Sequence, residues 1–281
     1  MQSNRSLGAC ACKLCLVLGV TIASGRAVAV GGIEEGLVGY WDFENVQGGI
    51  ARDLSGNGNV GTIFGASTVP GIWRGNALSF DGMNDYVSVG DALELNPTFA
   101  VTVSAWIKAA SVTGYPPIAK KSGLGSTQGY GYALEAHFNP KGTGPGAGLI
   151  VSTAGPSAVW PNWADITTDH WYFVAGVYDG TWLTTYWGDA ANTPIALSRV
   201  PGSGNIAPST NPLYIGSDPS NPSRFFDGLI DEVRVYDRAL TGGEITDVYR
   251  VPAAVPEPAS VVCGIIGLGM IGAYIKKHRS P

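Results

Sequence analysis

The sequence has few cysteines, and none of them lies in its middle. All four cysteines, Cys10, Cys12, Cys15 and Cys263, lie near the two ends of the chain. The middle therefore has no disulfide and no cysteine-based zinc or redox site, and its stability must come from its core. Charged residues make up only 14% of the chain, against about 25% in an ordinary soluble domain. A composition with so few charges excludes coiled coils and long helical arrays.

Motifs of common enzyme classes are also missing. The three histidines, His137, His170 and His278, form no His-Glu-x-x-His zinc motif, and no Gly-x-Ser-x-Gly nucleophile elbow occurs. No glycine loop followed by lysine indicates phosphate binding. The glycine-rich stretches 123–131 and 142–148 are typical of flexible surface loops. We therefore expect no enzymatic activity.

The sequence is rich in turn residues and aromatic side chains. It has 40 Gly, 18 Pro, 8 Trp, 12 Tyr and 8 Phe, and 45% of it is hydrophobic, enough for a sizeable core. Six of the 17 basic and one of the 22 acidic residues lie in the two ends, which leaves 11 basic and 21 acidic residues in the middle. A middle that is this acidic repels a phosphate backbone, so nucleic acid is excluded as a partner.

The first 29 residues are typical of a secretory signal peptide. Basic residues precede a short apolar stretch, 14–24, and Ala27 and Ala29 form an A-x-A cleavage site. A membrane helix is the alternative, but eleven apolar residues are too few to span about 30 Å of hydrocarbon. The mature chain is predicted to begin at residue 30.

The C-terminal segment has three parts. A Pro-rich linker, 251–258, ends in Pro256-Glu257-Pro258; an uncharged segment, 259–275, follows; the tail 276–281 is basic. The uncharged segment is just long enough to cross a membrane, and the basic tail marks its cytoplasmic end. The three parts resemble the PEP-CTERM sorting signal of bacterial exported proteins. That resemblance implies cleavage by an exosortase and delivery to the cell envelope or extracellular matrix. A plain membrane anchor is the alternative.

Strand patterns recur over residues 37–240. Residues 101–107 and 171–177 alternate between apolar and other side chains, which is typical of half-buried antiparallel strands. Asp179-Gly180 predicts a hairpin turn, and residues 80–82 predict a second one. Thr241 and Glu244 form a capping box that opens a short helix ending near residue 249.

Six sequence blocks resemble a known family. In chain order they are GYWDFE (39–44), DLSGNGNVG (53–61), ALSFDG with DYV (77–87), VSAWI (103–107), HWYFV (170–174) and GLIDEVRVY (228–236). The set resembles the laminin G-like domains of the concanavalin A-like lectin/glucanase superfamily. That resemblance implies an all-β fold over residues 30–250, a two-sheet antiparallel sandwich of jelly-roll type. The superfamily holds lectins, adhesion modules and glycosidases.

One loop and one strand residue predict a calcium site. Asp53, Asn57 and Asn59 supply oxygen ligands around glycines, although an ordinary turn explains the same pattern. Strand alternation places Asp231 on the same apolar face as Leu229, Val233 and Val235. A carboxylate buried on such a face needs a partner. Glu232 and Arg234 then form an outward surface pair. Relatives often bind calcium where the first and last strands meet, and the resemblance thus groups Asp53, Asn57, Asn59 and Asp231 at one site.

The aromatic side chains divide into two groups. Trp41, Phe43, Phe80, Trp171 and Phe173 follow strand patterns and are predicted core residues. Trp160 and Trp163 flank Pro161 in a loop, and together with Tyr115 and Trp187 they are candidate sugar-stacking side chains. Packing of the loop onto the sheet is the alternative.

The sequence thus predicts an exported module that binds a glycan or a surface partner. A glycoside-active enzyme and a structural matrix protein without a ligand are the alternatives. Glycosidases of this superfamily typically carry Glu-x-Asp-x-x-Glu on one strand. The stretch from Leu229 to Arg234 keeps only Asp231 of that motif, which argues against catalysis.

Overall fold

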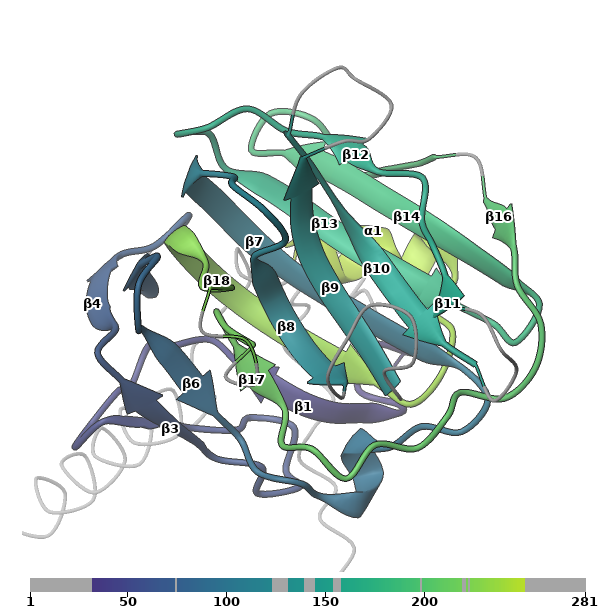
Figure 1. Cartoon of the computed structure of the whole chain (residues 1–281), viewed down its shortest axis with the longest axis horizontal. Coiled ribbons are helices and arrows are strands. Elements are labelled where there is room, and N and C mark those ends of the chain that lie inside the picture. The colour runs from purple at the N-terminus through teal and green to yellow at the C-terminus, as the bar shows by residue number, and fades with distance from the viewer. Residues whose placement is uncertain are drawn as a thin grey trace, which may run out of the picture.

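The computed structural model describes residues 32–73, 75–122, 131–138, 145–153, 158–197, 199–218, 221 and 223–250. These residues form two stacked antiparallel sheets and one α-helix (Figure 1). The predicted all-β sandwich with a short C-terminal helix is confirmed. The predicted signal peptide, the Pro-rich linker, the apolar segment 259–275 and the basic tail lie outside the described residues.

We call the sheet next to the helix the back sheet, and β18 lies at its centre. β18 pairs with β7 on one side and with both β5 and β1 on the other. The back-sheet strands, in order across the sheet, are β15 (Ile195–Ala196), β14 (Trp182–Asp189), β13 (Tyr172–Tyr178), β7 (Val101–Ser111), β18 (Asp227–Tyr236), β5 (Asn76–Asp81) and β4 (Ser67–Pro70), with β1 (Leu37–Trp41) beside β18 and β16 (Val200–Pro201) beside β14.

The other sheet, which we call the front sheet, faces the viewer in Figure 1. Its strands, in order across the sheet, are β11 (Ala158–Val159), β10 (Pro145–Ser152), β9 (Gly131–Phe138), β8 (Pro117–Ser122), β17 (Tyr214–Ile215), β6 (Tyr86–Ser88), β3 (Gly61–Phe64) and β2 (Ile50–Ala51), with β12 (Ala164–Asp165) also beside β10. A short 3₁₀ helix, η2 (Leu93–Leu95), precedes β7.

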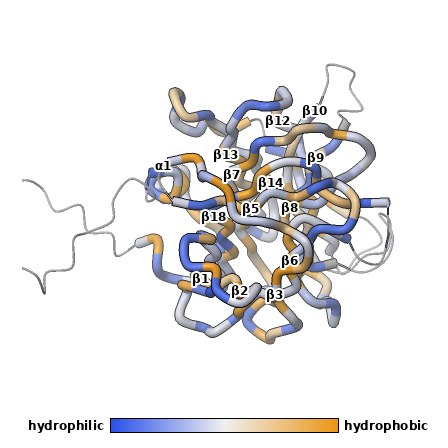
Figure 2. Tube along the Cα trace, turned by 90° about the vertical axis from the view of Figure 1, so that its left-hand side faces the viewer, coloured by the Kyte–Doolittle hydropathy of each residue, from blue (hydrophilic) through white to orange (hydrophobic). Residues whose placement is uncertain are grey.

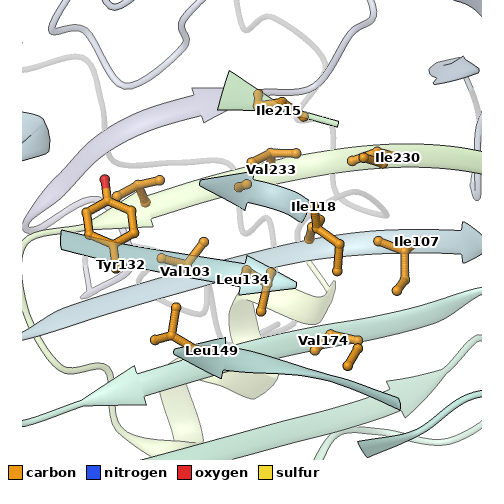
Figure 3. Packing of buried hydrophobic residues seen from close by; sticks show 14 of the residues in the cluster. Val103, Ile107, Ile118, Tyr132, Leu134, Leu149, Val174, Ile215, Ile230 and Val233 are labelled. Carbon is orange, nitrogen blue, oxygen red and sulfur yellow. The ribbon is translucent and has the colours of Figure 1, made fainter. Parts of the chain in front are cut away.

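The main core lies between the two sheets. Figure 3 shows Val103, Ile107 and Val174 of the back sheet packed against Leu134 and Leu149 of the front sheet. A second, smaller core lies between the back sheet and α1 (Gly242–Arg250). Figure 2 shows the resulting order of layers: α1, then the back sheet, then the front sheet.

The helix forms where the capping box predicts it. Thr241 Oγ1 accepts a hydrogen bond from the Glu244 backbone nitrogen at 3.3 Å, and a Glu244 carboxylate oxygen accepts from the Thr241 nitrogen at 2.8 Å. Because α1 covers the back sheet, β7 and β13 are buried on both faces. The prediction that these strands are half-buried is therefore wrong: alternation marks two different cores rather than a core and a solvent face.

Most predicted core aromatics are confirmed. Trp41, Phe43, Phe80 and Phe173 are buried. Trp171 is only partly buried, because it precedes β13 at the margin of the smaller core. The fully buried tryptophan of that core is instead Trp106.

Only one of the two predicted hairpin turns joins neighbouring strands. Gly180 has a φ of +88°, and the Asp179 carboxylate accepts hydrogen bonds from the backbone nitrogens of Thr181 and Trp182, which closes the β13–β14 hairpin. The turn at Gly82, with φ +72°, instead carries the chain from β5 in the back sheet to β6 in the front sheet. A glycine turn fixes the local bend, but it does not determine which strands pair.

A bulge in β18 reverses the predicted alternation of its side chains. The register against β7 shifts by one residue between Asp231 and Arg234, and Glu232 has a φ of +54°. Ile230, Val233 and Val235 therefore all face the main core, while Asp231 pairs with Trp106 on the opposite face. The prediction that Asp231 shares a face with Val233 and Val235 is wrong for this reason.

Glu232 and Arg234 are also not a surface pair. Both are buried, and an Arg234 guanidinium nitrogen lies 2.6 Å from a Glu232 carboxylate oxygen. The Arg234 guanidinium lies 3.9 Å from the centre of the Tyr40 ring, and the Tyr40 hydroxyl donates to the same glutamate. β1 pairs with this part of β18 in the same sheet, and Tyr40 of β1 packs against Arg234, so a pair that alternation places in solvent lies inside the protein.

Candidate functional site

The outer face of the front sheet points away from the core and away from α1 (Figure 2). Along β9, Tyr132, Leu134 and Ala136 belong to the main core. Because side chains alternate along a strand, Glu135 and His137 point to the outer face. This face carries aromatic, cationic and acidic side chains close to one another.

Three aromatic side chains from separate segments form a row on this face. The His137 ring lies 4.7 Å from the Trp163 ring in a stacked arrangement, and the Tyr115 ring lies 4.1 Å from His137, edge to face. Tyr115 is 41% exposed and Trp163 is partly exposed, whereas His137 is buried between them. We call Tyr115, His137 and Trp163 the first aromatic row.

Glycines in β10 make room for the Trp163 end of this row. A Cβ atom at Gly148 would lie 2.8 Å from the Pro161 ring, and one at Gly146 would lie 3.0 Å from the Trp163 Cβ. The loop before β12 thus lies directly on the surface of the sheet. The prediction that residues 142–148 are a flexible loop is wrong for residues 145–148, which belong to β10; their glycines serve close packing.

An ion-pair group, made of Lys120, Glu135, Asp218 and Arg224, lies beside this row. The Lys120 ammonium is 2.5 Å from an Asp218 carboxylate oxygen and 3.5 Å from one of Glu135. An Arg224 guanidinium nitrogen lies 3.9 Å from Asp218, and the guanidinium lies 5.1 Å from the Tyr115 ring. Burial raises the pKa of the Glu135 carboxyl, and the charges of Lys120 and Arg224 oppose that shift.

Together the row and the ion-pair group form a surface of a kind that binds polar ligands with apolar faces. Aromatic rings bury the C–H faces of such a ligand, and a few fixed polar groups orient it. The buried ion pairs hold Lys120 and Glu135 in place, so little side-chain freedom is lost on binding. Tyr115 contacts both His137 and Arg224, which makes the two groups one site.

The four sugar-stacking candidates do not all lie together. Tyr115 and Trp163 meet through His137, and Trp160, which is 40% exposed, lies in the same loop as Trp163. Trp187 lies elsewhere: it is paired with Val174 in the back sheet and packs beside Tyr172 against the main core.

Sequence reasoning missed His137 and the ion-pair group. The only local signal was in β9, where Glu135 and His137 alternate with apolar residues. Alternation predicts that these side chains point away from the core, but it does not predict which other side chains they contact. Lys120 and Asp218 are 98 residues apart in the sequence, so no local pattern could pair them.

The predicted calcium residues have other partners in the structure. Both oxygens of the Asp53 carboxylate accept hydrogen bonds, from the backbone of Tyr40, from Ser55 and from the backbone of Asn59. The side-chain amides of Asn57 and Asn59 donate to the carbonyls of residues 37 and 38 in β1. The loop is thus held as a turn against β1, which is the alternative that the sequence left open.

Asp231 lies apart from that turn. Its carboxylate accepts from the backbone nitrogens of Ile72, at 3.3 Å, and Glu232, at 2.8 Å. Burial, followed by the charges of Glu232 and Glu44, raises the pKa of Asp231 to about 8. The hydrogen-bond partners of Asp231 are thus different from those of the Asp53 turn, and calcium binding at these four residues stays a prediction.

No group of three or more His, Cys, Asp or Glu side chains among the described residues is arranged to hold a metal ion. Within the same residues, no helix has the length and apolar character needed to cross a membrane.

The sequence profile of the concanavalin A-like lectin/glucanases superfamily (Laminin_G_3) matches residues 81–246, more than half of the chain. The chain therefore belongs to this superfamily, as the sequence blocks predicted. Among curated proteins, no sequence matches it.

Solved structures with the same fold include glycan-binding proteins. Domain 4 of AbnA, an extracellular GH43 arabinanase from Geobacillus stearothermophilus solved with arabinotriose, has a TM-score of 0.55 and 19% identity, covering 75% of this chain and 97% of that one. The ligand binding domain of botulinum neurotoxin serotype D, solved with N-acetylneuraminic acid, has a TM-score of 0.57 and 12% identity. The match covers 79% of this chain and 52% of that one. Trypanosoma rangeli sialidase has a TM-score of 0.56 and 19% identity, and the match covers 84% of this chain and 36% of that one. This chain thus spans about half of the toxin domain and about a third of the sialidase. At these identities the likeness shows the fold alone.

Proposed function

We propose that this protein is a non-enzymatic carbohydrate-binding module, and that it binds glycan on the outer face of the front sheet. The observation that carries the proposal is the first aromatic row, with an exposed Tyr115 at one end and Trp163 at the other, beside a fixed ion-pair group. Relatives of the same fold that were solved with arabinotriose and N-acetylneuraminic acid support it.

The test is a glycan array followed by titration of the best ligand. Trp163→Ala is expected to weaken binding about tenfold, because removing one aromatic contact from a binding surface costs more than about 1 kcal/mol. Trp187→Ala is the matched control: it removes the same side chain from the other sheet and should leave affinity unchanged. Equal losses in both variants would contradict the proposed site.

A glycoside-active enzyme is the second candidate, because two carboxylates share one ammonium. Glu135 and Asp218 both contact Lys120 Nζ, at 3.5 Å and 2.5 Å, so their nearest oxygens are within about 6 Å of each other, and retaining glycosidases hold their two carboxyl groups about 5–5.5 Å apart. Both carboxylates are 5% exposed, which favours a structural ion pair. Chromatography of the bound glycan after long incubation distinguishes a binding module from an enzyme, because only an enzyme would give shortened products. A matrix protein without a ligand would bind nothing on the array.

We further propose that the protein is exported and sorted to the cell envelope through its C-terminal segment. In the native host, replacing Pro256, Glu257 and Pro258 by alanine should leave the protein uncleaved in the membrane fraction, because the sorting enzyme no longer recognises it. The measurement is immunoblotting of membrane and released fractions. Pro252→Ala, in the same linker, is the control and should be processed normally. Normal processing of the triple variant would contradict sorting.

A further inference from the structure

A second group of aromatic side chains lies on the same outer face, at the other end of the front sheet. Phe64 of β3 and Tyr86 of β6 are paired residues whose rings stack at 4.6 Å. The Tyr214 ring of β17 meets Tyr86 edge to face at 6.0 Å. Phe64 is 43% exposed, and the two tyrosines are partly exposed. We call Phe64, Tyr86 and Tyr214 the second aromatic row.

Strand alternation places this row on the outer face. Val87 and Ile215, the neighbours of Tyr86 and Tyr214, belong to the main core, so the two tyrosines point away from it. Neither tyrosine is needed to fill the space between the sheets. An exposed stack of rings therefore remains on the surface.

The ion-pair group lies between the two rows. Tyr214 is the register partner of Lys120 across the β17–β8 pair. Burial, followed by Tyr86 and the Asp218 carboxylate, raises the pKa of Tyr214, which agrees with its position next to that group. On the other side, Arg224 contacts Tyr115 of the first row. The order across the sheet is second row, ion-pair group, first row.

This arrangement extends across six neighbouring strands. From β3 through β6, β17, β8 and β9 to β10 there are five strand-to-strand steps, and steps of about 4.8 Å give about 24 Å. That is the length of several linked sugar rings rather than of one or two. The strand positions set this length, independently of which rings are exposed.

The charges at the centre indicate the nature of the ligand. Lys120 and Arg224 are matched by Glu135 and Asp218 within the group. A self-neutralised centre gives no net attraction to a polyanion or a polycation. Arg224, whose side chain is 18% exposed, is the most exposed member of the group and can donate hydrogen bonds to hydroxyl groups. Aromatic rows on both sides fit the C–H faces of sugar rings.

We propose that the outer face of the front sheet binds an uncharged glycan chain of several sugar units, laid across the strands, with the second aromatic row as a second subsite. This inference rests on the proposed function, because it extends the same site. It places the middle of the chain over the ion-pair group and its two ends on the two aromatic rows.

The experiment is isothermal titration of the purified protein with arabino-, xylo- and cello-oligosaccharides of two to six units, together with the best ligand from the array. Affinity should rise at least tenfold from the shortest to the longest member of the series that binds. Phe64→Ala should lower affinity for the longest member about tenfold, the loss expected for one aromatic contact. It should leave affinity for the shortest member, held at the first row, unchanged.

Phe99→Ala is the matched control, since Phe99 is also exposed but packs near Gly180 outside the front sheet. This substitution should change the affinity neither for the longest nor for the shortest oligosaccharide. Affinity that is independent of length, or unaffected by Phe64→Ala, would overturn the second subsite and leave the proposed function intact. Absence of any binding by the wild-type protein would overturn both. A wild-type dimer that Phe64→Ala dissociates in sedimentation would instead assign the row to contact between two copies of the chain.

Discussion

Trp106→Ala is expected to lower the free energy of unfolding by about 3–5 kcal/mol, the range for truncating a large buried aromatic side chain. Trp106 is completely buried in the core between the back sheet and α1. Its ring packs against Trp73 at 5.4 Å, Phe173 at 5.7 Å and Tyr249 of α1 at 5.2 Å. Its removal leaves a cavity that β7 and α1 cannot close without shifting toward each other and disturbing their packing.

Denaturant unfolding followed by tryptophan fluorescence and circular dichroism measures this loss. Trp171→Ala is the matched control, because Trp171 is only partly buried at the margin of the same core. Its loss of stability should be clearly smaller. Equal losses in the two variants would mean that α1 does not seal this core in solution.

Asp231 is expected to make stability fall as the pH rises from about 4 to about 8. Its folded pKa of about 8 is above the ordinary value of 3.8, so the unfolded chain releases this proton first. The contribution of the protonated Asp231 is therefore complete below pH 4 and is lost as the pH rises through the folded pKa. A shift of this size corresponds to a change on the order of 5 kcal/mol.

Asp231→Asn isolates this effect, because the amide does not titrate. The variant loses one acceptor, which costs about 1 kcal/mol, but it should be more stable than the wild type near pH 8. The difference between the two unfolding free energies should change sign between pH 4 and pH 8. Glu44 and Glu232, whose charges act on Asp231, are present in both proteins. A constant difference would contradict the raised pKa.

The same pair of proteins tests calcium. A bound calcium ion would favour the ionised Asp231 carboxylate, so adding calcium to chelator-treated wild-type protein at pH 8 would raise its melting temperature by mass action. The Asp231→Asn variant would respond less. No thermal shift in the wild type would rule out the calcium site.

Much of the local structure could be predicted from the sequence. The capping box at Thr241, the turn at Gly180 and the alternation of residues 101–107 each depend on residues close together in the chain, and the structure confirms the elements they predict. The family could be identified as well, because the sequence blocks contain whole strands and turns.

The sequence by itself determined the strands, the helix and most of the core, because alternation, turns and caps are local properties, and its resemblance to a family implied the two-sheet fold. Only the tertiary structure decided which faces are covered. A one-residue bulge at Glu232 moved Asp231 out of the main core, and β1 buried Arg234. The site arose in the same way: Tyr115, His137 and Trp163 come from three segments, and they meet because the strands of the front sheet pair across long distances in the chain. Such pairings depend on the packing of the whole domain, which no short stretch of sequence contains.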